Sequence, residues 1–204
     1  MMKLDLKKDF KELYSPSAKV PQLLEVPAMQ FAMINGKGDP NTSQEYKEAV
    51  QALYSVSYTL KFAIKKQQQT DYSVMALEGL WWLEDDFTFD FFKRDNWRWT
   101  MMIMQPEVVT PETFKQAVEE VIRKKGLEAA VKLRLETFDE GLSVQMLHLG
   151  PYSEEPATIE KLHHFMEAEG YVQHGNHHEI YLSDPTRTAP EKLKTILRLP
   201  VQII

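Results

Sequence analysis

The chain has 204 residues, of which 43% are hydrophobic and 26% charged, so it is long enough for one large domain or two small ones around a packed core. A net charge of −6 without a stripe of Lys and Arg argues against a polyanion as direct ligand, so no nucleic-acid contact is expected. The absence of cysteine excludes disulfides and cysteine nucleophiles, and the lack of a long apolar run or a signal-peptide core predicts a cytoplasmic protein without membrane contact.

The first half of the chain predicts the order strand, helix, strand, strand. Residues 29–40 form a strand that ends in a glycine-proline turn, and residues 41–66 carry the apolar stripe of an amphipathic helix. Two segments rich in strand-favouring residues follow at 72–83 and 97–106. The acidic connection at 83–92 between them is interpreted as solvent-facing.

A helix is predicted between the two halves, over residues 110–126. Thr110 is placed to cap its start, Pro111 occupies the first helical position, and Gly126 is placed to end it. This segment is interpreted as a linker helix.

The second half repeats the order of the first. Residues 141–156 read as a strand with a Gly-Pro turn, 157–170 as a helix closed by glycine, and 177–185 as a strand ended by proline. A short helical turn and a last strand follow at 190–204. The repetition lies in the order of the elements and hardly in their sequence.

This double order predicts an α+β fold of two strand-helix-strand-strand (SHS2) units that form a pseudo-two-fold antiparallel sheet. The helices are expected on one face, which leaves the other face as a central ligand cleft on the pseudo-dyad. The expected organisation is a single domain over residues 1–204. Its first unit covers about 25–106, the linker helix about 110–126, and the second unit about 135–204.

The stretch "HHEIYLSD" at residues 177–184 contains the strongest candidate for a functional acid. In an extended strand Ile180 faces the core, while Glu179 and Tyr181 share the opposite face. A carboxyl and a phenol in a row are costly to bury without partners, which is typical of a site. Glu179 is therefore a candidate base or counter-ion and Tyr181 a candidate orienting group, with surface charge and simple packing as the structural alternatives.

Tryptophans supply the second signal, because aromatic walls suit flat or cationic ligands. Trp82 and Trp99 are predicted to line the cleft, whereas Trp81 and Trp97 are assigned to the core. Tyr152, in the Gly-Pro turn, is placed to close the rim of the cleft. The complete set of ligand-binding candidates is Glu78, Trp82, Trp99, Met101, His148 and Tyr152.

Two other patterns do not indicate a functional site. His177 and His178 face opposite sides of a strand, so together with Glu179 they do not predict a metal site. "NGKGDP" at residues 35–40 lacks the ending of a phosphate-binding loop and reads as a turn.

Four segments together carry a resemblance to a known family. They are "LEGLWW" (77–82), "WRWTMMIMQP" (97–106), "LHLGPYSEEPATI" (147–159) and "HEIYLSDPTRTAPEKLKTILRLPV" (178–201). From about residue 20 onward the chain resembles the GyrI-like small-molecule-binding family, which is also called the effector-binding domain family of multidrug-responsive transcription activators.

The resemblance implies a duplicated strand-helix-strand-strand fold, an aromatic cleft, and a buried glutamate facing the ligand, to which Glu179 corresponds. It also implies the activities of stand-alone members, some of which hydrolyse the cyclopropane ring of cyclopropanoid DNA-alkylating compounds. Others sequester drugs or modulate DNA gyrase. The chain has no room for the helix-turn-helix of the transcription activators, so direct contact with DNA is not expected.

Two functions therefore remain open. The chain is either a hydrolase in which Glu179 activates water against a strained electrophilic ring, or a binding module that sequesters hydrophobic or cationic drugs or docks on a partner such as gyrase. Neither function needs a cofactor.

Overall fold

The computed structural model of the chain describes residues 2–83 and 94–204. The acidic connection that was expected to face solvent lies outside these residues from position 84 onward. The protein is a mixed α and β structure dominated by a large antiparallel sheet, in agreement with the predicted fold class. None of the helices within the described ranges is both long and apolar enough to cross a membrane.

Within the described residues, nine strands join in one sheet, and all of their pairings are antiparallel. Eight of them lie in the order β2-β8-β11-β10-β5-β6-β3-β7, and β9 pairs with β11. Their bounds are β2 Gln22–Val26, β3 Met29–Lys37, β5 Leu77–Leu83, β6 Trp97–Met104, β7 Arg134–Phe138, β8 Gly141–Leu149, β9 Tyr171–Gln173, β10 His177–Tyr181 and β11 Lys194–Ile203. A separate parallel pair is formed by β1 (Met2–Leu4) and β4 (Thr70–Tyr72).

Three longer helices and several short ones complete the fold. The longer helices are α3 (Gln44–Gln68), α4 (Pro111–Lys125) and α5 (Glu155–Ala168). The short helices are α1 (Leu6–Asp9) and α2 (Lys11–Tyr14), and single 3-10 turns are η1 (Arg94–Asn96), η2 (Glu128–Lys132), η3 (Tyr152–Glu154) and η4 (Pro190–Lys192).

The helix ends follow the sequence signals closely. The Ser43 side chain accepts a hydrogen bond from the backbone N–H of Tyr46 and caps α3. In α4, Thr110 and Thr113 form a reciprocal capping box, and Gly126 ends the helix with a positive φ of 64°. The prediction of this helix is confirmed, and α5 begins two residues before its expected start.

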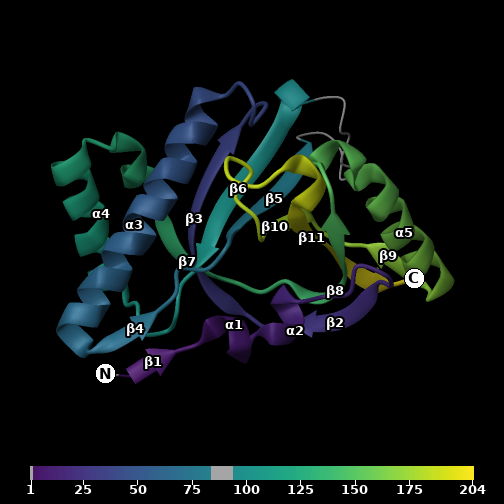
Figure 1. Cartoon of the computed structure of the whole chain (residues 1–204), viewed down its shortest axis with the longest axis horizontal. Helices are drawn as coiled ribbons and strands as arrows, with labels where there is room; N and C mark the ends of the chain where they lie inside the picture. The colour runs from purple at the N-terminus through teal and green to yellow at the C-terminus, as the bar shows by residue number, and fades with distance from the viewer. Residues whose placement is uncertain (1, 84–93) are drawn as a thin grey trace.

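Helices α3 and α5 lie on the same face of the sheet, above opposite halves of it (Figure 1). Tyr46 of α3 packs on Trp81 of β5, and Thr158 of α5 is 2.9 Å from the ring of His148 in β8. Side chains that pair directly across neighbouring strands lie on the same face of a sheet. The register from β5 through β10 and β11 to β8 therefore places Trp81 and His148 on one face, the face that both helices cover. The central strands β5 and β10 are left between the two helices.

The face opposite the helices is not the expected groove. It is covered by the N-terminal segment, in which the sequence predicted no element: Tyr14 of α2 donates a hydrogen bond to Glu78 of β5, and Arg198 of β11 donates to the Leu13 carbonyl. The open space lies on the helix-bearing face instead, between α3 and α5. The prediction of a cleft on the face without helices is therefore wrong, because the N-terminal segment covers that face.

The strand order is compatible with a duplication. On one side of the β5–β10 pair lie β6 and β3, and on the other side lie β11 and β8, so both halves use the same order of elements. The duplication and the exact boundaries of its two units stay predictions.

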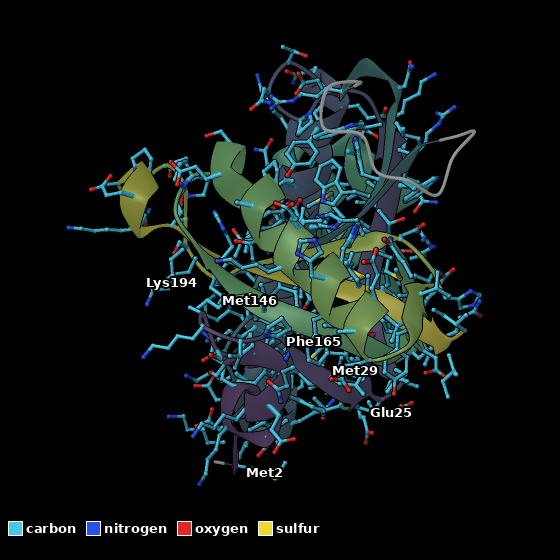
Figure 2. The ribbon with its side chains drawn as sticks, turned by 90° about the vertical axis from the view of Figure 1, so that its right-hand side faces the viewer. Met2, Glu25, Met29, Met146, Phe165 and Lys194 are labelled. Atoms are coloured by element: carbon cyan, nitrogen blue, oxygen red, sulfur yellow. The ribbon has the colours of Figure 1, made fainter. Side chains whose placement is uncertain are left out.

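The apolar core has two parts. The larger cluster fills both faces of one half of the sheet: Leu53 and Leu60 of α3 belong to it on one face, and Phe31, Met102 and Leu13 of α2 on the other. The smaller one lies under α5, where Phe165 packs against a cluster that contains Met146 of β8 (Figure 2). Each helix therefore fixes its own half of the sheet, and the space between the halves is available for a ligand.

Candidate functional site

A cleft of about 1260 Å³ lies between α3 and α5, above the central strands β5 and β10. This volume exceeds the roughly 300–1,000 Å³ of typical small-molecule sites. The spacing of side chains along α3 explains one wall, because residues four apart lie on one side of a helix. The aromatic residues that line the cleft are Tyr14, Tyr46, Tyr54, Tyr58, Trp81, Trp97, Tyr152 and Tyr181.

Glu179 lies in this cleft and is held by two neighbours on its own strand. The Tyr181 hydroxyl donates a 2.7 Å hydrogen bond to Oε2, and Nε2 of His177 lies 3.1 Å from Oε1. The three residues alternate along β10 and therefore point to the same face. Glu179 is 7% exposed, so its carboxyl group is fixed in orientation but still borders the cleft.

Gly79 explains how an indole can reach this acid. Gly79 pairs directly with Glu179 across the β5–β10 ladder, and a Cβ at this position would lie 2.7 Å from Nε1 of Trp81. Because glycine leaves the space open, Trp81 Nε1 donates a 3.0 Å hydrogen bond to the Tyr181 hydroxyl. A chain of donors from Trp81 through Tyr181 thus ends on the Glu179 carboxyl group.

The aromatic rings meet mainly edge to face. The Trp81 and Trp97 centroids are 5.3 Å apart at 67°, and those of Tyr152 and Tyr181 are 6.0 Å apart at 82°. Tyr46 packs 6.1 Å from Trp81 at a smaller angle of 30°. Such packing fixes the orientation of the rings at the wall of the cleft.

A second carboxyl group lines the cleft, at Glu155 in the first turn of α5. Burial first and the negative charge of Glu179 second raise the pKa of Glu155 far above its usual range, although a hydrogen bond with Thr195 lowers it in part. Glu155 therefore keeps its proton at neutral pH, and it does so beside a second carboxyl group in the same cleft.

The tyrosines of the cleft remain neutral donors over the physiological range. Burial and the charge of Glu179 raise the pKa of Tyr181 well above its usual value. Burial, followed by the charges of Glu155 and Glu179, raises the pKa of Tyr152 to about 12. Their hydroxyls can donate hydrogen bonds to a ligand or to Glu179 but do not act as bases.

The structure brings together three of the residues singled out from the sequence, namely Glu179, Tyr181 and Tyr152. Tyr152 is 37% exposed and lies at the rim, where the sequence placed it.

The structure places the tryptophans differently from the sequence-based expectation. Trp81 and Trp97 line the cleft, whereas Trp99 is fully buried beneath α3, with its ring against Gly36 and Tyr46. Trp82 faces the other side of β5, since side chains alternate along a strand.

Met101 pairs directly with Gly79 but is fully buried, so it supports the floor of the cleft from inside the core. Glu78 lies on the face away from the cleft. It accepts hydrogen bonds from Tyr14 and from His178, and it therefore does not serve as a second base beside Glu179.

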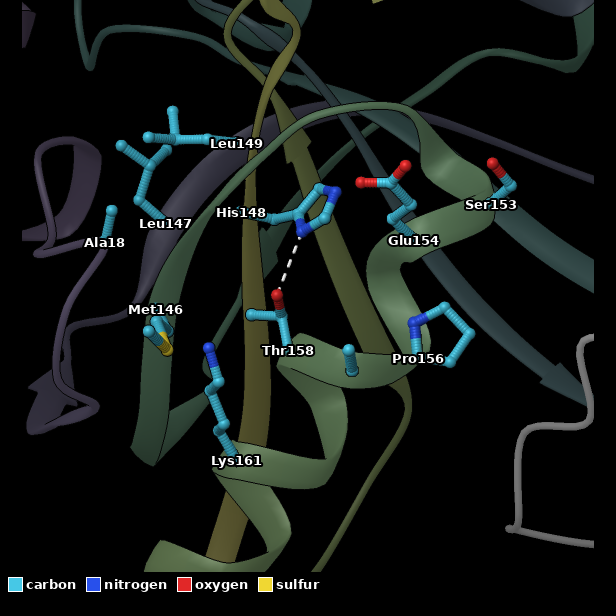
Figure 3. A pocket seen from close by; sticks show the side chains of 11 residues that line it. Ala18, Met146, Leu147, His148, Leu149, Ser153, Glu154, Pro156, Thr158 and Lys161 are labelled. Atoms are coloured by element: carbon cyan, nitrogen blue, oxygen red, sulfur yellow. Dashed lines mark hydrogen bonds between the residues drawn. The ribbon is translucent and has the colours of Figure 1, made fainter. Parts of the chain in front are cut away.

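His148 lies outside the main cleft as well. It borders a separate, shallower pocket of about 500 Å³ beside α5 (Figure 3). Its Nδ1 is 2.9 Å from the Thr158 hydroxyl and its Nε2 is 3.2 Å from the Pro151 carbonyl, so both ring nitrogens have partners. These contacts tie the Gly-Pro turn to the helix, which indirectly positions Tyr152 and Glu155.

A closed polar network occupies the face opposite the cleft. His178 lies 3.0 Å from Glu78 and 2.8 Å from Glu140, and Arg198 donates to Glu140 at 3.0 Å. Burial alone would lower the pKa of His178, but Glu140 and Glu78 raise it to about 9. Burial would likewise raise the pKa of Glu140, but His178 and Arg198 lower it to about 2. The network is an ion cluster in which each charge has a partner.

No group of three or more His, Asp or Glu side chains suited to a metal ion occurs in the part of the chain that the structure describes. The acids of the cleft are held by tyrosine, histidine and threonine instead.

Sequence reasoning missed Glu155, Tyr46, Tyr54 and Tyr58. The three tyrosines occur at four-residue spacing or multiples of it along α3, and this stripe could have indicated a ligand-facing side of the helix. Glu155 gives no such signal, because an acid in a first helical turn is ordinary on any surface.

The chain is similar to a known family of small-molecule-binding domains and to several solved structures. A model of the GyrI-like small molecule binding domain matches residues 19–202. An uncharacterized conserved protein from Listeria innocua is 44% identical, with a TM-score of 0.91 over 98% of this chain and 100% of the other. A hydrolase from Listeria innocua is also 44% identical, with a TM-score of 0.87 over 98% and 100%.

A more distant likeness concerns the fold alone. The C-terminal domain of EcmrR is 12% identical, with a TM-score of 0.55 over 90% of this chain and 98% of that domain. Comparison with curated protein sequences gave no match.

Proposed function

Because the chain belongs to the GyrI-like small molecule binding domain family, we propose that it binds flat aromatic or hydrophobic molecules in the cleft between α3 and α5 and hydrolyses a strained electrophilic ring within them. The substrate class is the cyclopropanoid DNA-alkylating compounds, and the role is detoxification. Relatives at 42% and 44% identity that carry the name hydrolase support a catalytic function.

The observation that carries the proposal is the Glu179 carboxyl group, fixed in an aromatic cleft by Tyr181 and His177. A general base must be oriented and within reach of a bound molecule, and both requirements fit this position. The Trp81 and Trp97 rings supply flat apolar surface on which a conjugated ligand stacks.

The proposed step adds one water to the substrate. Glu179 accepts a proton from water as the water oxygen bonds to a carbon of the three-membered ring. The ring bond that breaks releases its electrons into the conjugated part of the ligand, and a proton taken up there completes the addition of water. Release of ring strain provides the driving force, so neither metal nor cofactor is required. Tyr181 keeps the Glu179 carboxyl group in one orientation throughout the step.

Binding without turnover is the alternative, and one feature favours it for cationic ligands. A carboxylate beside aromatic faces attracts a positive charge both directly and through the ring quadrupoles. In that case Glu179 is a static counter-charge and the protein sequesters the compound.

Mass spectrometry separates the two functions. The purified protein is incubated with a cyclopropanoid alkylating compound, and a product heavier by one water is expected to accumulate over many turnovers. A boiled sample controls for spontaneous hydrolysis. Saturable binding without a water adduct beyond that control would refute the hydrolase proposal and leave sequestration.

A further inference from the structure

Glu155 is a second buried acid of the cleft, with only 1% of its surface exposed. Its Oε1 has no hydrogen-bond partner within residues 2–83 and 94–204. Buried carboxyl oxygens in folded proteins nearly always have a partner, so an unpaired one at the wall of a cleft indicates a partner from outside the chain. A ligand bound in the cleft would reach this wall.

Several charged and titratable groups face Glu155. They are Glu179 and Tyr181 of β10 and Tyr152 of η3, and none of them is a cation. The start of α5 favours a negative charge, but burial and the charge of Glu179 outweigh it and raise the pKa of Glu155. Glu155 is therefore a neutral acid that can donate a proton at neutral pH.

We propose that Glu155 is the catalytic acid of this cleft and donates its proton to the ligand oxygen on which negative charge develops as the ring opens. The inference rests on the proposed hydrolysis and extends it to the substrate. A suitable substrate carries a hydrogen-bond acceptor, such as a carbonyl oxygen conjugated with the strained ring, on the side of Glu155.

In the proposed step one acid takes a proton and the other gives one. The water oxygen bonds to the ring carbon, the carbon–carbon bond breaks, and its electron pair moves through the conjugated system to the carbonyl oxygen. Glu179 takes the proton from water while Glu155 gives its own to that oxygen. Transfer of one proton from Glu179 to Glu155 then restores the starting state, and the net change is the addition of one water.

Glu155→Gln keeps a hydrogen-bond donor of the same size but cannot transfer a proton. Turnover of a cyclopropanoid is expected to fall by about 10²-fold or more, the usual contribution of a general acid. Glu160→Gln, on the exposed side of the same helix, is the matched control and should keep wild-type turnover. Thermal unfolding of both variants verifies that they fold.

Two further readouts distinguish an acid from a structural residue. Wild-type turnover should decline at alkaline pH as Glu155 loses its proton, and this decline should vanish in Glu155→Gln. The loss in the variant should also shrink for a substrate whose carbonyl oxygen becomes a more acidic hydroxyl in the product, because negative charge on such an oxygen needs less help from an acid.

Infrared spectroscopy tests the protonation without any turnover. The carbonyl band of a buried protonated carboxyl group should be present in the wild-type protein at neutral pH and absent in Glu155→Gln. Absence of the band in the wild type, or wild-type turnover by an active enzyme carrying Glu155→Gln, would overturn this inference alone. A wild-type protein that does not hydrolyse cyclopropanoids would overturn the proposed function and the role of Glu155 with it.

Discussion

Strand β10 presents two very different polar environments on its two faces. On one face His178 is enclosed by Glu78 and Glu140, and Arg198 completes the cluster by donating to Glu140, to Gln145 and to the Leu13 carbonyl. On the other face Glu179 borders an open cleft, and the neighbouring Glu155 has an oxygen without a partner. The two environments are separated by the thickness of a single strand.

The difference indicates which of the two regions is structural and which is functional. Perturbed pKa values occur in both regions, so a perturbed pKa alone does not identify a site. The distinguishing features are the access of a ligand and an unsatisfied hydrogen-bonding group. The closed cluster binds the N-terminal segment to the sheet, and the open pair is available for chemistry.

Breaking the closed cluster should have the largest effect on stability. Arg198→Met leaves Glu140 buried without one of its two charge partners, and loss of one member of a buried ion pair costs about 3–5 kcal/mol. Urea unfolding measures this loss. Lys124→Met, which removes an exposed pair with Glu120, should change stability little. Equal losses in the two variants would contradict the structural role of the cluster.

The same cluster predicts a pH dependence of stability. His178 has its pKa raised from 6.5 to about 9 in the folded protein, so its contribution is complete below pH 6.5 and is lost as the pH rises through 9. By linkage the loss is about 3 kcal/mol. Glu155 titrates in an overlapping pH range and also changes the stability there. Its contribution cancels when the unfolding free energy of the wild type is compared with that of His178→Gln at each pH. The difference between the two proteins should fall by about 3 kcal/mol as the pH rises through 9. A difference that stays constant with pH would show that His178 does not hold a proton in the fold.

Adjacent tryptophans on the two faces of β5 provide the most finely matched comparison. Trp81→Ala removes a wall of the cleft and should weaken binding of a flat aromatic ligand by about 1 kcal/mol or more, as expected for lost stacking. Trp82→Ala, on the opposite face, should leave the affinity unchanged once folding has been verified. Calorimetric titration gives both values. A larger effect at Trp82 would show that the ligand binds elsewhere.

The sequence was sufficient to predict most elements of the sheet and its helices. Hydrophobic periodicity located α3, and the capping residues Thr110 and Gly126 located α4 almost to the residue. The N-terminal segment was missed because its role depends on contacts remote in sequence, such as the bond of Tyr14 with Glu78. No local pattern in residues 2–14 indicates that partner.

Residues of the candidate site were predicted correctly only where they lie close together on one strand. Glu179 and Tyr181 are two residues apart and share a face in any extended strand. The tryptophans required more information, because alternation shows which residues share a face but not which face a helix covers. Trp99 is on the correct face yet lies under α3, while Gly79 gives Trp81 access to the cleft.

The central claim is that Glu179 activates water in the cleft, and a single-turnover experiment in water enriched in heavy oxygen tests it most directly. The wild-type protein should place one labelled oxygen on the opened ring carbon of a cyclopropanoid substrate. Glu179→Gln keeps the size of the side chain but cannot take a proton, so the rate of label incorporation should fall by about 10²–10⁴-fold, while ligand affinity changes little. Labelled product formed by Glu179→Gln at the wild-type rate would contradict the assignment of this residue as the base.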